Sequence, residues 1–245
     1  MGIDLGNFEA NVQQAIRHFW SHRNLARMRQ IERGIQDQGE RSSVTSGKNM
    51  DGFINLATSI VRDNGLSNAN IVFDGRINTT LPGYFRPTKS WDLLVINEGR
   101  LVAVIEFKSQ VGPSFGNNFN NRVEEAIGSA LDIAEAYRNG VFGDIVRPFL
   151  GFFFLLEDCA ASRKPVRNPE PNYPVFPEFH NACYAERYNI LCQKLVQENL
   201  YTAASIILSP REATETGEYT EMGNMTGIRT FFASLAGHIA AEAGR

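Results

Sequence analysis

The chain has 245 residues, of which 43% are hydrophobic and 21% charged, and its formal net charge at pH 7 is −3. These values exclude a collagen-like, coiled-coil or wholly disordered chain. The longest apolar run, 149–156, is far shorter than the roughly 20 residues that a membrane-spanning helix needs. No secretory signal pattern is visible at the N-terminus, and three cysteines are too few for a disulfide scaffold. We therefore expect a cytoplasmic protein without a membrane partner.

The spacing of apolar residues predicts the secondary structure. A repeat of three to four residues indicates a helix, and a short apolar run between turn residues indicates a strand. Five prolines between Pro165 and Pro177 exclude regular structure there. The expected elements are a helix at 5–33, a loop at 36–49, a helix at 51–63, strands at 70–73, 91–97 and 101–108, a helix at 121–139, a buried central strand at 149–156, a helix at 182–199, a strand at 203–208 and a helix at 227–243.

The order of these elements predicts the fold class. Between residues 51 and 156 the order is helix, three strands, helix, strand, which is typical of an α/β fold with a central mixed β-sheet flanked by helices. No repeat or clear linker divides the chain. We therefore expect a single domain over 1–245, in which an N-terminal helical segment (1–50) and a C-terminal α/β extension (157–245) pack on a core at about 51–156.

Charge is unevenly distributed along the chain. Seven basic residues but only three acidic ones lie between Arg17 and Lys48, whereas four glutamates gather within 212–221. An acidic protein can in this way present a basic face to a nucleic acid. A solvated helix face explains the same run equally well.

The stretch 91–110 carries the residues that indicate chemistry. Its two strands are apolar on both faces for most of their length, yet Asp92, Glu106 and Lys108 are set into them, away from the turn. Isolated charges in such surroundings cost several kcal/mol each unless they are paired or bind a metal.

The register of this hairpin decides whether the three charges share a face. A three-residue turn at 98–100, with Gly99 in the left-handed region, places Asp92 opposite Glu106. Lys108, two positions beyond Glu106, then lies on the same face. A two-residue turn would shift the register and move Asp92 to the other face, so the expected site depends on this turn.

Two carboxylates that face each other repel unless a cation lies between them. Oxygen ligands completed by water suit Mg²⁺. A lysine beside such an ion can hold and help to deprotonate a water molecule, or stabilise charge on a phosphoryl group. Together these groups supply a Lewis acid and a nucleophile for attack at phosphorus.

An aspartate, thirteen intervening residues and Glu-x-Lys at the end of a hydrophobic strand resemble the PD-(D/E)XK nuclease motif, although Trp91 stands where that superfamily has proline. Segments such as SWDLLVINEGRLVAVIEFKSQVGPSFGNNFNNRVEEAIGSA further resemble the XhoI-like type II restriction endonucleases, and the likeness spans most of the chain. It implies a PD-(D/E)XK nuclease-like core and a bacterial homodimer that cuts double-stranded DNA at the palindrome CTCGAG, leaving 5′ overhangs. It also implies that Asp92 and Glu106 bind Mg²⁺ and that Lys108 orients or activates the attacking water.

An enzyme that reads base pairs needs phosphate contacts and polar side chains at base edges. The polar stretch after Lys108 is a candidate source, although a hydrated loop with an asparagine helix cap explains it equally well. Lys48 and Lys89 are candidate phosphate contacts. The candidate DNA-binding residues in the stretch are Gln110, Ser114, Asn117, Asn118, Asn120, Asn121 and Arg122.

A palindromic target implies a two-fold symmetric protein. The terminal helix is a candidate dimer surface, because it carries more large apolar residues than a solvated helix needs. Packing in the core explains this pattern at least as well. The residues concerned are Phe231, Phe232, Leu235 and Ile239.

Three functions are consistent with these patterns. The leading hypothesis is a Mg²⁺-dependent, sequence-specific DNA endonuclease. The second is a PD-(D/E)XK nuclease of DNA repair or recombination without strict specificity, which would degrade a plasmid to a smear instead of discrete fragments. The third is a non-catalytic α/β DNA-binding protein in which Asp92, Glu106 and Lys108 form an internal ion-pair network.

Overall fold

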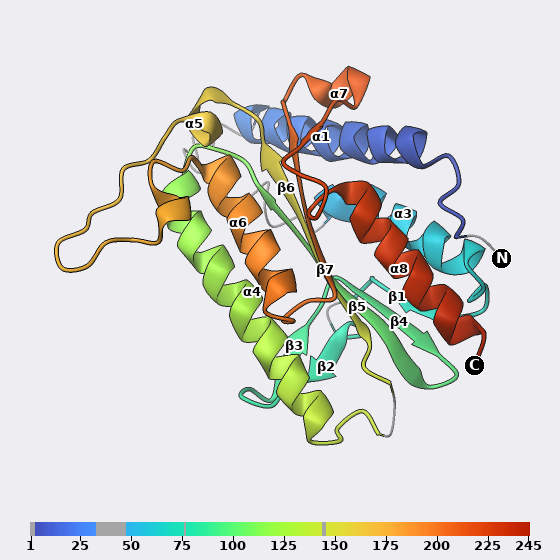
Figure 1. Ribbon diagram of the computed structural model, residues 1–245. Coiled ribbons are helices and arrows are strands. Elements are labelled where there is room, and N and C mark those ends of the chain that lie inside the picture. Colours follow the sequence, from blue (N-terminus) through green and yellow to red (C-terminus); the bar gives the residue numbers. More distant parts are fainter. Residues whose placement is uncertain (1–2, 33–47, 76, 144–145) are drawn as a thin grey trace.

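The computed structural model describes residues 3–32, 48–75, 77–143 and 146–245 (Figure 1). In chain order its elements are α1 (Phe8–Glu32), η1 (Lys48–Met50), α3 (Asp51–Asp63), β1 (Asn70–Val72), β2 (Thr80–Pro82), β3 (Thr88–Ser90), β4 (Leu93–Asn97), β5 (Arg100–Gln110), α4 (Phe115–Arg138), β6 (Phe149–Glu157), α5 (Ala160–Arg163), η2 (Pro177–Phe179), α6 (Tyr184–Gln197), β7 (Ala203–Ser209), α7 (Ala213–Thr216), β8 (Thr220–Glu221) and α8 (Ile228–Ala243).

Six of these strands form one mixed sheet in the order β1-β4-β5-β6-β7-β8. The pairs β5–β6 and β6–β7 are parallel, and the other neighbours are antiparallel. All nine residues of β6 are buried, as expected for a central strand with helices over both faces. The expected α/β class with a central mixed sheet is confirmed. Because β7 and β8 belong to the same sheet, the segment 157–245 completes the sheet that the core begins.

Helices cover both faces of the sheet (Figure 1). On one face, apolar residues of α1, α3 and α8 form a single buried cluster with those of the strands. On the other face, α4 and α6 lie side by side and form a second cluster. The charged residues of β5 discussed below lie on the α4–α6 face, since they alternate with residues that face the first cluster.

The terminal helix α8 is part of the core. Phe231, Phe232, Leu235 and Ile239 are each no more than 1% exposed. The candidate dimer surface on these residues is therefore wrong. Their side chains pack in the core against β6 and β7 and are not accessible to a partner.

The expected helices and strands are present, with different ends in places. The helix predicted at 51–63 coincides with α3, whereas the one predicted at 121–139 begins earlier, at Phe115. The loop predicted at 36–49 lies, up to residue 47, outside the described residues. The hairpin β2–β3, which forms a separate two-stranded sheet, was not expected, because strands of three residues leave almost no periodic pattern.

Part of the basic N-terminal run is bound within the protein. Arg17 donates hydrogen bonds to the carbonyl oxygens of Glu215 (2.8 Å) and Thr216 (3.0 Å), and Arg23 is 6% exposed. Arg17 therefore helps to attach the helix to the acidic C-terminal segment. Among the helices of the described residues, none is both long and apolar enough to cross a bilayer.

The tip of the β2–β3 hairpin is fixed to α4 by Asp132, which is 2% exposed. Its carboxylate accepts hydrogen bonds from the backbone N–H of Tyr84 (2.8 Å) and Phe85 (2.7 Å) and from Nε of Arg86 (2.8 Å). Burial alone would raise the pKa of Asp132, but these hydrogen bonds lower it, so the side chain is ionised at neutral pH.

Removing this anchor should loosen the hairpin. We expect Asp132→Ala to lower the free energy of unfolding by roughly 2–4 kcal/mol, because two backbone N–H groups and a guanidinium lose their acceptor. Limited chymotrypsin digestion should then cleave faster after Tyr84 and Phe85. The control is Glu135→Ala on the same helix, which removes only an ion pair with the exposed Arg138. Equal digestion of both variants would contradict the anchoring role.

Candidate active site

The turn between β4 and β5 has two residues, Glu98 and Gly99. Asn97 pairs directly with Arg100, and both turn residues have positive φ angles of 52° and 78°. The three-residue turn expected from the sequence is therefore wrong. Two consecutive residues in the left-handed region match the right-handed twist of the strands, which favours the shorter turn.

A β-bulge at Val102 restores the register that the shorter turn would have lost. The register shifts within the ladder so that Val102 has no partner on β4, and beyond this point Leu93 pairs with Ile105. Asp92 and Glu106 are the next residues along the two strands, so they lie opposite each other. The expected pairing is thus reached by a different route from the one that the sequence suggested.

A residue near the C-terminus contacts the backbone of the bulge. The carbonyl oxygen of Val102 accepts a hydrogen bond from Nε2–H of His238, on α8, at 3.1 Å. An extra residue in a strand leaves its backbone groups without ladder partners, and this contact supplies one. Helix α8 therefore helps to fix the register of the hairpin.

The three residues predicted for the site converge on one face of the sheet. Glu106 Oε1 accepts from the ammonium group of Lys108, whose Nζ is also 3.7 Å from Asp92 Oδ2. Asp92 Oδ2 accepts a hydrogen bond from the backbone N–H of Phe107 at 2.8 Å. The side chain of Glu106 is 7% exposed and that of Asp92 is 36% exposed. Asp92 therefore lies at the open side of the cluster, with Glu106 beneath it.

A fourth charged residue joins them. Lys89, on β3, lies with Nζ 2.9 Å from Glu106 Oε2. It also lies 4.3 Å from the centre of the Trp91 ring. No pattern in the sequence pairs Lys89 with Glu106, because Lys89 comes from the separate hairpin and not from the β4–β5 ladder.

The two carboxylates are in different electrostatic states. Burial, followed by the nearby charge of Glu106, raises the pKa of Asp92 above its ordinary value. Burial would also raise the pKa of Glu106, but Lys108 and Lys89 outweigh it and lower that pKa. Burial opposes the charge of Lys108 as well, yet Glu106 and Asp92 raise its pKa. Glu106 and Lys108 are thus a carboxylate and an ammonium at neutral pH.

These donors fit a hard divalent cation. Within the ranges that the structure describes, no group of three or more His, Cys, Asp or Glu side chains gathers around a point. Two carboxylates are nevertheless what Mg²⁺ commonly takes from a protein, with water and substrate phosphate in the remaining positions. The open side at Asp92 leaves room for such ligands.

The polar residues after Lys108 lie mostly on the first turns of α4. Asn117, Asn120 and Asn121 are exposed there, and Asn118 is half-buried. Arg122 pairs with Glu125 at 2.5 Å. Ser114, just before the helix, is exposed.

One DNA-binding candidate, Gln110, has surroundings of a different kind. Gln110 is 3% exposed; its amide nitrogen donates to the carbonyl oxygen of Ser114, and its amide oxygen accepts from the hydroxyl of Tyr188, both at 3.3 Å. These contacts suit a packing role better than contact with a base. The side chain of Lys48 lies outside the described part of the structure.

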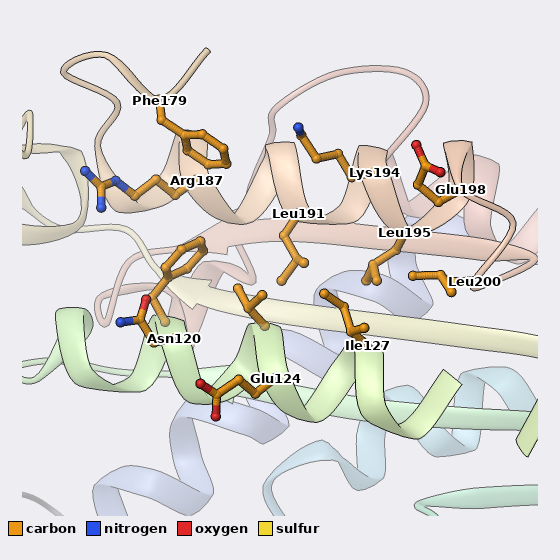
Figure 2. A pocket seen from close by; sticks show the side chains of 12 residues that line it. Asn120, Glu124, Ile127, Phe179, Arg187, Leu191, Lys194, Leu195, Glu198 and Leu200 are labelled. Atoms are coloured by element: carbon orange, nitrogen blue, oxygen red, sulfur yellow. The ribbon is translucent and has the colours of Figure 1, made fainter. Parts of the chain in front are cut away.

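A groove of about 390 Å³ between α4 and α6 does not include the charged cluster (Figure 2). Ile127 from α4 and Leu191 and Leu195 from α6 point into it, so its lining is mainly apolar. Its two carboxylates, Glu124 on α4 and Glu198 just after α6, belong to no group of three or more possible metal ligands among the described residues. Asp92, Glu106 and Lys108 therefore stay the candidate active site.

Comparison with known proteins places the chain in a family. Residues 29–221 match the family model described as restriction endonuclease XhoI. The chain is 48% identical over 210 residues to the type II restriction enzyme XhoI of Xanthomonas vasicola, an alignment that covers 86% of this chain and 84% of that protein.

Two further relatives carry similar names. The type II restriction enzyme BstVI of Geobacillus stearothermophilus is 46% identical over 213 residues, covering 85% of this chain and 94% of that protein. The type II restriction enzyme AbrI of Azospirillum brasilense is 52% identical over 173 residues, covering 71% and 77% respectively. No solved structure shows a significant match. The cluster of two acids and a lysine in a mixed α/β sheet, together with these matches, shows that the chain belongs to the XhoI family of restriction endonucleases.

Proposed function

We propose that this restriction endonuclease hydrolyses phosphodiester bonds of double-stranded DNA in a Mg²⁺-dependent reaction at Asp92, Glu106 and Lys108. The observation that carries the proposal is the convergence of these side chains on one face of the sheet. Family membership supports the reaction class, and the pair of oxygen-donor residues supports the choice of Mg²⁺.

Asp92 and Glu106 would hold the ion in this reaction. When bound, Mg²⁺ supplies a Lewis acid for the scissile phosphate and lowers the pKa of a bound water molecule. Lys108 is an ammonium at neutral pH, since both carboxylates raise its pKa. It can therefore donate hydrogen bonds to the attacking water or to a phosphate oxygen, and stabilise the negative charge that develops there.

The start of α4 is our proposal for base recognition. It follows the catalytic strand β5 after four residues, so a duplex at the metal site lies within reach of Asn117, Asn118, Asn121 and Arg122. Asparagine suits the adenine edge and arginine the guanine edge. Ser114 stays a candidate for DNA contact and Lys48 for a phosphate contact, whereas Lys89, the other candidate phosphate contact, is paired with Glu106.

Specificity and assembly are proposed from the likeness to the XhoI family. We propose the palindrome CTCGAG as the target, cut to leave 5′ overhangs. A palindrome is matched by a two-fold symmetric protein, so we propose a homodimer. The bacterial cytoplasm is the proposed compartment. One nuclease domain over 1–245 is the proposed organisation, supported by a six-stranded sheet whose strands come from residues 70 to 221.

Plasmid digestion tests the function directly. With Mg²⁺ we expect discrete fragments whose sequenced ends carry the proposed overhang, and with a chelator we expect no cleavage. A smear would instead favour a nuclease without strict specificity. No cleavage of any plasmid that contains CTCGAG would contradict the proposal, provided that the Mg²⁺-loaded protein is folded by circular dichroism.

A further inference from the structure

Glu106 is held by two lysines, although the nuclease motif contains only one. The ammonium group of Lys108 contacts Oε1 of Glu106. The ammonium group of Lys89 contacts Oε2, with Nζ 2.9 Å from that oxygen. The side chains of Lys89 and Glu106 are 13% and 7% exposed, so the pair is largely shielded from water. Breaking such a pair from one side leaves a buried charge without compensation.

The two lysines differ in how firmly they are placed. Lys108 is on β5, which is hydrogen-bonded on both sides within the main sheet, and it lies between both acids. Lys89 is on β3 of the separate two-stranded sheet. Its ammonium has two other partners: the carbonyl oxygen of Ser90 at 3.3 Å and the Trp91 ring at 4.3 Å. It can therefore leave Glu106 without becoming isolated.

The charges of the cluster balance without a metal. Asp92 and Glu106 supply two carboxylates when ionised, and Lys89 and Lys108 supply two ammonium groups. Each oxygen of Glu106 already has an ammonium partner, so a divalent cation held by this carboxylate would have to compete with one of the two lysines. Like charges at a few ångströms in a shielded site repel by more than they do in water. Because Lys89 has other partners and Lys108 lies between both acids, Lys89 is the ammonium group that would give way.

We propose that Lys89 is the counter-ion of Glu106 in the metal-free enzyme, and that a divalent cation binds only by displacing its ammonium group. Lys89 thereby holds the buried carboxylate in place before the metal arrives, and it lowers the affinity for the metal. This inference rests on the proposed function, because it requires the cation to bind at Asp92 and Glu106.

Calorimetric titration of the DNA-free protein with MgCl₂ and MnCl₂ tests the inference. Lys89→Gln should bind both ions roughly tenfold more tightly than the wild type, since the competing charge is gone. Lys89→Arg, which keeps a charged partner for the carboxylate and so protects folding, should bind them no more tightly than the wild type.

Lys194→Gln is the matched control. Lys194 also combines an ion pair, with Glu178 at 2.7 Å, and a ring contact, with Phe176 at 5.1 Å, but it lies on α6 away from the acids. Its metal affinity should equal that of the wild type. Tighter binding by Lys194→Gln would show that any lost positive charge has the effect, and it would overturn the proposal.

Tryptophan fluorescence follows the ammonium group itself. The chain has two tryptophans, so a Trp20→Phe background leaves Trp91 as the reporter. Adding MgCl₂ should change the emission of Trp91 when Lys89 moves relative to the ring, and Lys89→Gln should remove most of that change. Metal binding with the same emission change in both proteins would overturn the proposal.

Failure of this inference is distinguishable from failure of the proposed function. If the wild type cuts plasmid DNA with Mg²⁺ but Lys89→Gln binds the ion no more tightly, Lys89 does not compete and the nuclease function stands. If the wild type neither cuts DNA nor binds Mg²⁺ more tightly than Asp92→Asn does, both proposals are wrong.

Discussion

Replacing Asp92 by asparagine is expected to reduce DNA cleavage by at least about a thousandfold, because the site loses one of two ligands of the proposed ion. Binding of a CTCGAG duplex should survive, since Asp92 contributes no attraction to phosphate. Single-turnover cleavage with Mg²⁺ and a gel-shift assay without Mg²⁺ measure the two effects. Cleavage at the wild-type rate by Asp92→Asn would contradict the assignment of Asp92 as a ligand.

The same substitution should stabilise the metal-free protein at neutral pH. The pKa of Asp92 is raised by burial and by Glu106. The folded state therefore binds the Asp92 proton more tightly than the unfolded state does. Protonated Asp92 contributes stability below the ordinary pKa of aspartate, and this contribution is lost as the pH rises through the pKa of Asp92 in the folded protein. The neutral amide of Asp92→Asn would avoid that loss while keeping an acceptor for the N–H of Phe107.

Melting curves at two pH values check whether Asp92→Asn stabilises the metal-free protein at neutral pH. The melting temperature of Asp92→Asn should exceed that of the wild type at pH 7, and the difference should shrink as the pH falls below the ordinary pKa of aspartate. Added Mg²⁺ should stabilise the wild type more than the variant, since a ligand stabilises only the state that binds it. A lower melting temperature for the metal-free variant at pH 7 would be contrary to this reasoning.

Replacing Glu106 by glutamine should abolish cleavage as well, but with the opposite effect on stability. Glu106 is the common partner of Lys89 and Lys108, and its side chain is 7% exposed. Loss of its charge leaves two ammonium groups close together in a shielded site. We expect the free energy of unfolding to fall by about 3–5 kcal/mol, as when a buried pair is broken from one side. Urea denaturation of the metal-free protein measures this loss.

The lowered pKa of Glu106 also determines how the loss of stability in Glu106→Gln depends on pH. Lys108 and Lys89 lower the pKa of Glu106 against the effect of burial. Its contribution to stability is thus present above the ordinary pKa of glutamate and lost as the pH falls through the folded value. The gap between Glu106→Gln and the wild type should be largest near neutral pH and should narrow in acid. Equal stability of the two proteins at pH 7 would show that the lysines do not depend on Glu106.

The nature of the site could be predicted from the sequence because burial and charge conflict there. The strands around Asp92, Glu106 and Lys108 are apolar on both faces, so the three charges require one another or a metal wherever the strands lie. The structure places them together, as expected. The helix at 51–63 and the central strand at 149–156 could also be predicted, since their patterns record directly which residues are buried.

The register of the hairpin could not be predicted from its own residues. The sequence suggested a three-residue turn, whereas the structure has a two-residue turn and a bulge at Val102 that together give the same pairing. The bulge is held by His238, which lies 136 residues further along the chain. A turn that is local and a contact that is distant together decide which face Asp92 occupies.

By itself, then, the sequence determined the longer helices and strands, the α/β class and the chemical character of the cluster, because hydrophobic periodicity and charges within apolar strands can be read directly from the chain. Only the tertiary structure decided that α8 belongs to the core, that Asn117 and its neighbours are helical, and that Lys89 reaches Glu106. Lys89 arrives on a three-residue strand of a separate sheet. Its partner is set by how two sheets pack, and packing between segments leaves no periodic trace in either of them.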